Sequence, residues 1–138
     1  MLGRNSYPSD YVAACRARVD AQLAAFRAVV AAVPKKSTAA VAELETQLCA
    51  GLVVELDAMF VHRVRSKEGK DGNPMNEVRM LSASILEHDA DLAADKTIKW
   101  KPESSVLGLA IGDSISLHAD DFERLAAAYF DAIDATFA

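Results

Sequence analysis

The stretch RSKEGKDGNPMNEVRM, which runs from Arg65 to Met80, is rich in polar residues and separates two long apolar patterns. Near its centre, Asn73 and Pro74 form a strong start signal for a helix, because asparagine caps free N–H groups and proline is tolerated at the first helical position. We therefore predict a helix from Pro74 to about Asp89. Its inward face should comprise Met75, Val78, Leu81, Ile85 and Leu86.

Two longer helices are predicted before this stretch. Apolar residues recur every seven positions and Pro34 blocks continuation, which predicts a first helix from Ser9 to Val33. The repeating positions are Val12, Val19, Phe26 and Val33, with Leu23 and Val30 between them. After the connector PKKST, with Ser37 or Thr38 as the cap, a second helix should reach about Val64. Its wide apolar face is typical of a helix that is central in a bundle or buried in an oligomer interface.

The region after the third helix has a different pattern. KTIKWK and GDSISL alternate polar and apolar residues, which predicts two short strands in a small arm over about 95–117, packed against the helices. A last helix should open at DDFE, where Asp120 and Glu123 have the spacing of a capping box. The fold class is therefore predicted as mainly α. We expect a single domain over residues 1–138, a four-helix bundle-like arrangement with a two-stranded β arm between helices 3 and 4.

Composition and charge exclude some classes of partner. The net charge of −5 argues against non-specific nucleic-acid binding, which normally depends on a basic surface. The acids concentrate after Pro102, where seven acids face one base, Arg124, so the rest of the chain is nearly neutral. The longest apolar run, LCAGLVV, is far shorter than the roughly 20 residues that span a bilayer. We therefore expect no nucleic-acid and no membrane partner.

Two cysteines lie inside the apolar stripes of the first two helices. Cys15 and Cys49 are expected to be free buried thiols. A disulfide between the two helices is the alternative, since the connector near Pro34 places the two positions about 6 Å apart along the helix axes. The N-terminus, MLGRNSYPSDY, lacks the apolar core of a signal peptide. These observations favour a cytoplasmic, reducing location.

The polar stretch itself is a candidate anion site. Cations stand just before a helix N-terminus, whose free N–H groups and positive dipole end favour phosphate or carboxylate. The candidate ligand-binding residues are Arg65, Lys67, Lys70, Asn73, Asn76 and Arg79. The alternative is an ordinary connection between helices, fixed by ion pairs. Under that alternative Glu68, Asp71 and Glu77 pair with Arg63, Arg65 and Arg79.

A metal site has weaker support, and we expect no cofactor. Glu55 and His62 are seven residues apart, which would place them on one face of the second helix. None of the three histidines has the close spacing of a specific metal motif such as H-E-x-x-H. No serine lies in a G-x-S-x-G elbow, so no catalytic residue is predicted. Trp100 is interpreted as an anchor that holds the arm against the helices.

Three functional hypotheses follow. The first is a non-enzymatic homo-oligomeric or interaction protein, expected to be a homodimer because its helices carry more apolar surface than four unequal helices can cover. The second is a binding module that holds a small anionic ligand at residues 65–79. The third is a metal-binding helical bundle that uses His62 with Glu55.

Overall fold

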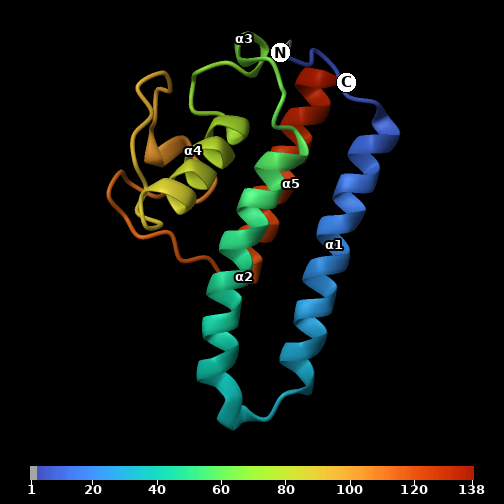
Figure 1. The fold of residues 1–138 in the computed structure, drawn as a ribbon, viewed down its shortest axis with the longest axis vertical. Coiled ribbons are helices and arrows are strands. Elements are labelled where there is room, and N and C mark those ends of the chain that lie inside the picture. Colours follow the sequence, from blue (N-terminus) through green and yellow to red (C-terminus); the bar gives the residue numbers. More distant parts are fainter. Residues whose placement is uncertain (1–2) are drawn as a thin grey trace.

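The computed structural model describes residues 3–138. Within them the chain forms five α-helices and two short 3-10 helices, and no strand, so the mainly α prediction is confirmed. The α-helices are α1 (Ser9–Ala32), α2 (Thr38–Met59), α3 (Arg65–Glu68), α4 (Pro74–Glu87) and α5 (Ala119–Phe137). The 3-10 helices are η1 (Lys35–Ser37) and η2 (Pro102–Ser104). Figure 1 shows α1 and α2 as a long hairpin, with α5 running beside its upper part and α4 packed across α2 and α5.

The core lies around α2, which contacts each of the other long helices. Phe60, at the end of α2, is fully buried and meets four aromatic rings edge-on, those of Tyr7, Tyr11, Tyr129 and Phe130. The inner face of α5 is buried along its whole length. It comprises Phe122, Leu125, Ala126, Tyr129, Phe130, Ile133 and Phe137. The apolar faces that suggested self-association are therefore largely consumed within one chain.

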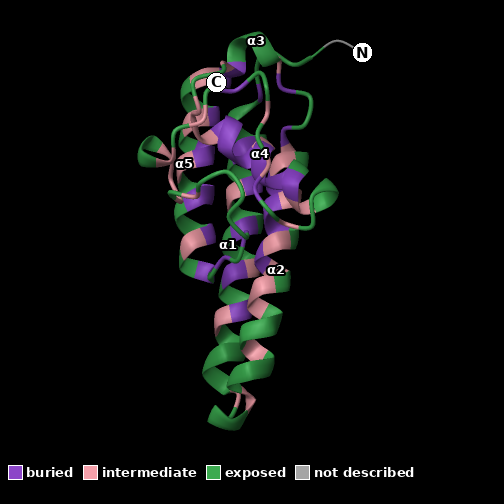
Figure 2. Cartoon of the chain, turned by 90° about the vertical axis from the view of Figure 1, so that its left-hand side faces the viewer, coloured by how far each residue is buried: buried purple, intermediate pink, exposed green. Residues whose placement is uncertain are grey.

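The α1–α2 hairpin extends beyond the core. The heptad seam of α1 is buried only as far as Phe26, and Val30, one turn further on, is 42% exposed. The cause is the short length of α5, which begins at Ala119, where its first N–H donates to Glu45 Oε2 at 2.7 Å. Past this level only α1 and α2 remain, and Figure 2 shows this end of the molecule almost entirely exposed.

The predicted two-stranded β arm is wrong. Between α4 and α5 the chain is irregular, and GDSISL pairs through Leu92 and Ala90 rather than with KTIKWK, in one isolated antiparallel bridge of Asp91 with Ser114. Its apolar side chains are instead fixed one at a time: Ile98, Ile115 and Leu117 enter the core. The alternation of polar and apolar residues in these two segments therefore arises because every second side chain packs against the helices. It does not indicate a ladder of hydrogen bonds between strands.

Individual anchors hold this irregular segment. Trp100 packs partly buried against the core, and its indole Nε1 donates to the Leu109 carbonyl at 2.9 Å within the same segment. The buried carboxylate of Glu77, on α4, accepts from the backbone N–H groups of Val106 and Leu107 at 2.8 and 3.0 Å. These bonds satisfy backbone donors that a strand partner would otherwise satisfy.

Helix ends follow the predictions in part. Asn73 caps α4 by accepting from the N–H groups of Met75 and Asn76, and Pro74 is the first helical residue, as predicted. Leu86 is 67% exposed, so it does not belong to the inner face of α4. At the start of α5, Asp121 accepts from the N–H of His118 at 3.0 Å, in place of the predicted Asp120 and Glu123 pair.

A candidate ligand pocket beside the chain termini

The polar stretch after α2 is organised around one buried carboxylate. Glu68 is 2% exposed, and its oxygens accept from Asn76 Nδ2 at 2.7 Å and from Arg79 Nη2 at 2.6 Å. Arg63 Nε lies 2.8 Å from Glu68 Oε1, although its N–H is not aligned with that oxygen for a hydrogen bond. Burial alone would raise the pKa of Glu68, but the hydrogen bonds and the charges of Arg79 and Arg63 outweigh it and lower that pKa.

Arg63 explains why α2 ends at Met59, five residues before the predicted end. Its guanidinium is buried and donates to the Phe60 carbonyl at 3.0 Å and to the Met75 carbonyl at 3.1 Å, which joins the end of α2 to the start of α4. It also bonds Asp57 at 2.9 Å and Tyr129 Oη at 3.2 Å. A buried charge is tolerated only when it is paired and hydrogen-bonded, so the chain turns here to satisfy this one.

The predicted anion-binding residues separate into two groups. Asn73, Asn76 and Arg79 come together around Glu68, where Asn73 Nδ2 also donates to the Glu68 carbonyl. The other three lie apart from this group. Arg65 donates to Thr97 Oγ1, Lys67 donates to the Asn5 carbonyl, and the Lys70 carbonyl accepts from the Lys99 N–H.

Ion pairing therefore accounts for much of the polar density in this stretch. Glu68 pairs with Arg63 and Arg79, as the alternative interpretation predicted. Glu77 is different, because it holds the segment around Val106 rather than an arginine. The anion site at residues 65–79 stays a prediction, and its amide members are already engaged with Glu68.

The two metal candidates do not meet. Glu55 is bonded to Arg18 at 2.8 Å and to Gln22 at 3.0 Å, both on α1. His62 lies beyond the end of α2, so the seven-residue spacing no longer places it on the same helix face as Glu55. Over residues 3–138, no three histidine, cysteine, aspartate or glutamate side chains are grouped so that they could hold a metal ion.

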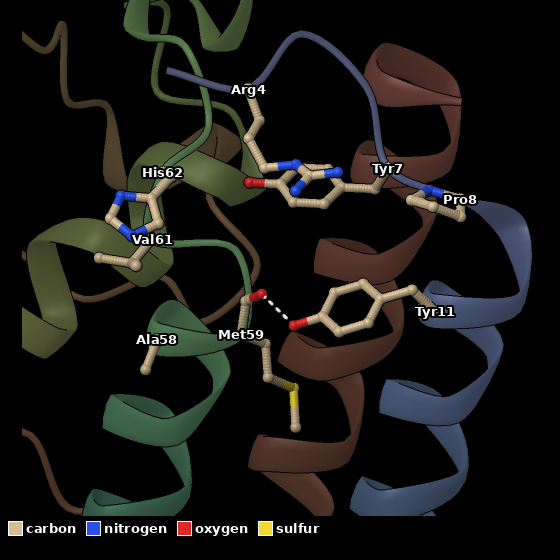
Figure 3. A pocket seen from close by; sticks show the side chains of 8 residues that line it. All are labelled: Arg4, Tyr7, Pro8, Tyr11, Ala58, Met59, Val61 and His62. Atoms are coloured by element: carbon tan, nitrogen blue, oxygen red, sulfur yellow. Dashed lines mark hydrogen bonds between the residues drawn. The ribbon is translucent and has the colours of Figure 1, made fainter. Parts of the chain in front are cut away.

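A pocket of about 510 Å³ opens between the N-terminal segment, the first turn of α1 and the end of α2 (Figure 3). It is lined by Arg4, Tyr7, Pro8, Tyr11, Ala58, Met59, Val61 and His62. Two of these side chains are basic and none is acidic. The pocket owes its shape to long-range backbone pairing. The Arg4 N–H donates to the His62 carbonyl at 2.6 Å, and the Val64 N–H donates to the Arg4 carbonyl at 3.0 Å.

Two tyrosines form the wall of the pocket on the α1 side. The Tyr7 and Tyr11 rings are stacked with centroids 6.1 Å apart. Tyr11 Oη donates to the Met59 carbonyl at 2.6 Å, which caps the last turn of α2 and fixes the ring, as Figure 3 shows. The Arg4 guanidinium lies over the Tyr7 ring, 5.3 Å from its centroid, and its own hydrogen bond to the Ser6 carbonyl is long, at 3.5 Å. Tyr11 is thus fixed by a short hydrogen bond, whereas the Arg4 guanidinium is held only by one long hydrogen bond and the Tyr7 ring.

The hydroxyl of Tyr7 has no hydrogen-bond partner among the described residues, although Tyr7 is only 6% exposed. Burial raises the pKa of this phenol, and the charges of Arg63 and Arg4 lower it to a smaller extent. The neutral hydroxyl is therefore a donor and acceptor held without a partner. Leaving such a group unsatisfied costs about 1–3 kcal/mol. In Figure 3 the hydroxyl points toward the side of the pocket where His62 lies.

Sequence reasoning missed Arg4, Tyr7 and Tyr11. The available signal was NSYPSDY, in which two tyrosines stand four residues apart across the start of a helix. No known protein family, no curated protein and no solved structure matches this chain. None of the helices in the described part of the chain is long and apolar enough to cross a membrane.

Proposed function

We propose that this protein is a non-enzymatic binding domain that holds a small organic acid with an apolar, ring-containing body in the pocket between Arg4 and His62. The observation that carries the proposal is the buried Tyr7 hydroxyl, which lacks a partner at the wall of a pocket with two basic side chains. The hydroxyl is covered in the free protein, so a ligand oxygen would reach it only after neighbouring side chains such as Arg4 moved aside. Such a contact would satisfy the hydroxyl and recover the cost of its burial.

The charge of the lining supports an anion. Arg4 offers a planar set of N–H donors that fits a carboxylate, and the absence of a lining carboxylate leaves its charge uncompensated within the pocket. His62 supplies an imidazole on the opposite side, and its side chain takes part in no hydrogen bond with the described residues. A carboxylate between these groups would gain charge-assisted hydrogen bonds, which are roughly twice as strong as neutral ones.

The shape and apolar lining support a ring. Tyr11 presents a fixed aromatic face, and Met59, Val61 and Pro8 supply apolar contact around it. Aromatic rings gain from stacking in addition to burial of their area, by about 0.5–1.5 kcal/mol per pair. Entry of the acid group would require Arg4 to leave the Tyr7 ring, and its weak anchoring makes this movement inexpensive.

The chemistry of the cysteines supports a binding rather than a catalytic role. Cys15 and Cys49 are buried and free, as expected from the sequence, and do not form the alternative disulfide. Burial raises the pKa of both thiols, for Cys49 to about 11, so the reactive thiolate is disfavoured. Two free thiols also support our proposal of a reducing, cytoplasmic location.

The test uses benzoate, benzamide and cyclohexanecarboxylate as probes and follows backbone amides in proton–nitrogen correlation spectra. Benzoate should shift the amides of Tyr7, Tyr11 and Val61, whereas uncharged benzamide should bind at least tenfold more weakly because it lacks the acid group. Cyclohexanecarboxylate, which retains the charge, should bind more weakly than benzoate because it lacks the aromatic ring. Arg4→Gln should weaken benzoate binding, and Arg18→Gln, on the same side of α1 but outside the pocket, should leave it unchanged.

Tyr7→Phe separates the role of the hydroxyl from that of the ring. Removal of an unsatisfied hydroxyl should leave the free protein as stable as wild type or up to about 1 kcal/mol more stable, while benzoate binding weakens several-fold. The proposal fails if no benzoate-dependent shifts appear at these amides, or if Tyr7→Phe binds benzoate as tightly as wild type.

A further inference from the structure

The end of the molecule opposite the pocket carries an uncovered apolar surface. We define the hairpin tip as residues 28–44, the part of α1, η1 and α2 that projects past the start of α5 (Figures 1 and 2). Eleven of its 17 residues are alanine, valine or leucine. Val29, Val30 and Leu44 are 46%, 42% and 47% exposed. Contiguous apolar surface of this kind on a folded chain marks an interaction site.

The charges of the tip and of its base are complementary. Lys35 and Lys36 stand at the far end of the tip. At its base, which we call the acidic root, lie Glu45, Asp120 and Glu123, and the Asp120 side chain is 90% exposed. Arg27 bonds both Asp120 and Glu123, and His118 Nδ1 lies 3.4 Å from Glu45 Oε1. The three carboxylates outnumber these two basic groups, so the root keeps a net negative charge. A partner segment with an apolar surface that ends in two lysines would fit here, because its apolar surface would pack on the tip and its lysines would lie beside the acidic root.

The chain itself contains such a segment, namely the hairpin tip. We propose that two copies of this chain form a two-fold dimer by overlapping their hairpin tips antiparallel, with the tip lysines of each copy against the acidic root of the other. From Arg27 to its end at Ala32, α1 spans about 7.5 Å, at roughly 1.5 Å per residue, and Pro34 then leads the chain to Lys35 in η1. A two-fold axis halfway between Arg27 and Lys35 therefore places the end of one tip beside the root of its partner. Such an isologous contact is self-complementary and closed.

A groove at the root fits this contact. It encloses about 360 Å³ and is lined by Phe26, Arg27, Val30, Val41, Glu45, His118, Ala119 and Asp120. The lining thus combines four apolar side chains with two carboxylates, and its two basic groups are already paired with carboxylates of the root. A lysine side chain matches this arrangement, because its methylene stem packs on apolar surface while its ammonium group reaches a charged or wet edge. The small side chains of the tip, mostly alanine and valine, allow the helices of the two copies to approach closely.

Sedimentation velocity from about 0.01 to about 1 mM protein tests the dimer by mass action. Wild type should pass reversibly from monomer to dimer over this range, and raising NaCl from about 0.05 to about 1 M should weaken the dimer several-fold by screening the lysines. Lys35→Glu with Lys36→Glu should abolish the dimer, and Leu44→Asp should weaken it. Lys96→Glu with Lys101→Glu changes the charge equally at exposed positions outside the tip and should leave the dimer intact.

Charge exchange gives the sharpest outcome. The chain with Asp120→Lys and Glu123→Lys should also be monomeric alone, yet an equal mixture of this chain with the Lys35→Glu, Lys36→Glu chain should dimerise, because both tip–root contacts are then between opposite charges. Circular dichroism establishes that each variant is folded. A monomeric wild type at every concentration would overturn the proposal and would leave the tip to a different partner. A Lys35→Glu, Lys36→Glu chain that dimerises like wild type would overturn it as well, as would a mixture that stays monomeric.

Discussion

Two buried glutamates, nine residues apart in the sequence, have pKa values shifted in opposite directions. Glu68 sits among Asn76, Arg63 and Arg79, and these neighbours lower its pKa. Glu77 accepts only from two backbone N–H groups, and burial raises its pKa in spite of them. The ionised form of Glu68 therefore favours folding, whereas ionisation of Glu77 works against it.

The two glutamates should give opposite pH dependences of stability. Because the folded pKa of Glu68 is lowered from 4.5, its contribution is present above that value and is lost as the pH falls through the folded pKa. Glu68→Gln should cost about 3 kcal/mol near pH 7, since it leaves Arg79 without its carboxylate and the buried Arg63 with Asp57 alone, and the cost should shrink toward about pH 3.5. Urea denaturation of wild type and variant at both pH values measures the change.

Glu77→Gln provides the matched control with the opposite sign. The contribution of Glu77 is fully present below 4.5 and is lost as the pH rises through its raised folded pKa. The gap between wild type and Glu77→Gln should therefore widen as the pH falls. If the difference in free energy of unfolding between wild type and Glu68→Gln is the same at the two pH values, the Glu68 cluster does not depend on an ionised carboxylate.

Among the elements, those encoded by local patterns were predictable. The heptads of α1, the Asn73–Pro74 start of α4 and the aromatic face of α5 each depend on neighbours within a few turns, and each lies where the pattern placed it. The end of α2 was not predictable in this way. It depends on Arg63 and on the pairing of Arg4 with residues 62–64, contacts that link the chain start to its middle.

The same reason explains the missed pocket and the wrong β arm. The pocket joins Arg4, Tyr7 and Tyr11 to the end of α2, so no local spacing encodes it. In the 95–117 segment, alternation of apolar residues is common to a strand and to an irregular segment whose side chains are buried in turn. The irregular conformation is favoured because Glu77, on α4, accepts hydrogen bonds from the N–H groups of Val106 and Leu107. The periodicity of the sequence carries no information about that long-range contact.

The contact of this irregular segment with the polar stretch should depend on Gly72. Its φ is +84°, and a Cβ placed there would lie 2.6 Å from the Lys99 carbonyl oxygen. Gly108 has a similar φ of +73°, but a Cβ there would meet nothing within 4 Å. Both alanine variants should be destabilised by about 1–2 kcal/mol, because alanine disfavours the left-handed conformation. The free energy of unfolding of Gly72→Ala should fall by at least about 1 kcal/mol more, because backbone atoms must also move.

Urea denaturation gives the two costs, and fluorescence locates the movement. Trp100 is the single tryptophan, and its Cα lies 4.0 Å from the Cβ position at Gly72. Gly72→Ala should therefore shift the tryptophan emission of the folded protein, and Gly108→Ala should leave it unchanged. Equal stabilities and equal spectra for the two variants would mean that the close approach of Gly72 to Lys99 is not maintained.

At the scale of the whole molecule, the two proposed activities lie at opposite ends. The pocket is next to the end of α5, where the Tyr7 N–H donates to the Phe137 carbonyl at 2.7 Å. The hairpin tip is at the far end of α1 and α2. A tip-to-tip dimer would therefore leave both pockets open and directed away from each other. Ligand binding and dimer formation should accordingly be independent, which makes their tests separable.

The last prediction concerns the stability of the tip itself. A two-helix hairpin without a third helix has few tertiary contacts, and isolated helices of this length are marginal in water, so the tip should open locally at far lower free energy than the core. Hydrogen exchange followed by mass spectrometry should show rapid exchange of amides in 28–44 at low protein concentration. Dimer formation adds the missing contacts, so protection should rise with concentration in this segment alone, while peptides from α4 and α5 stay protected throughout.

The Lys35→Glu, Lys36→Glu chain should keep a fast-exchanging tip at every concentration. If the tip of wild type is as protected as the core at the lowest concentration, two helices are sufficient for its stability, and the physical need for a second copy disappears.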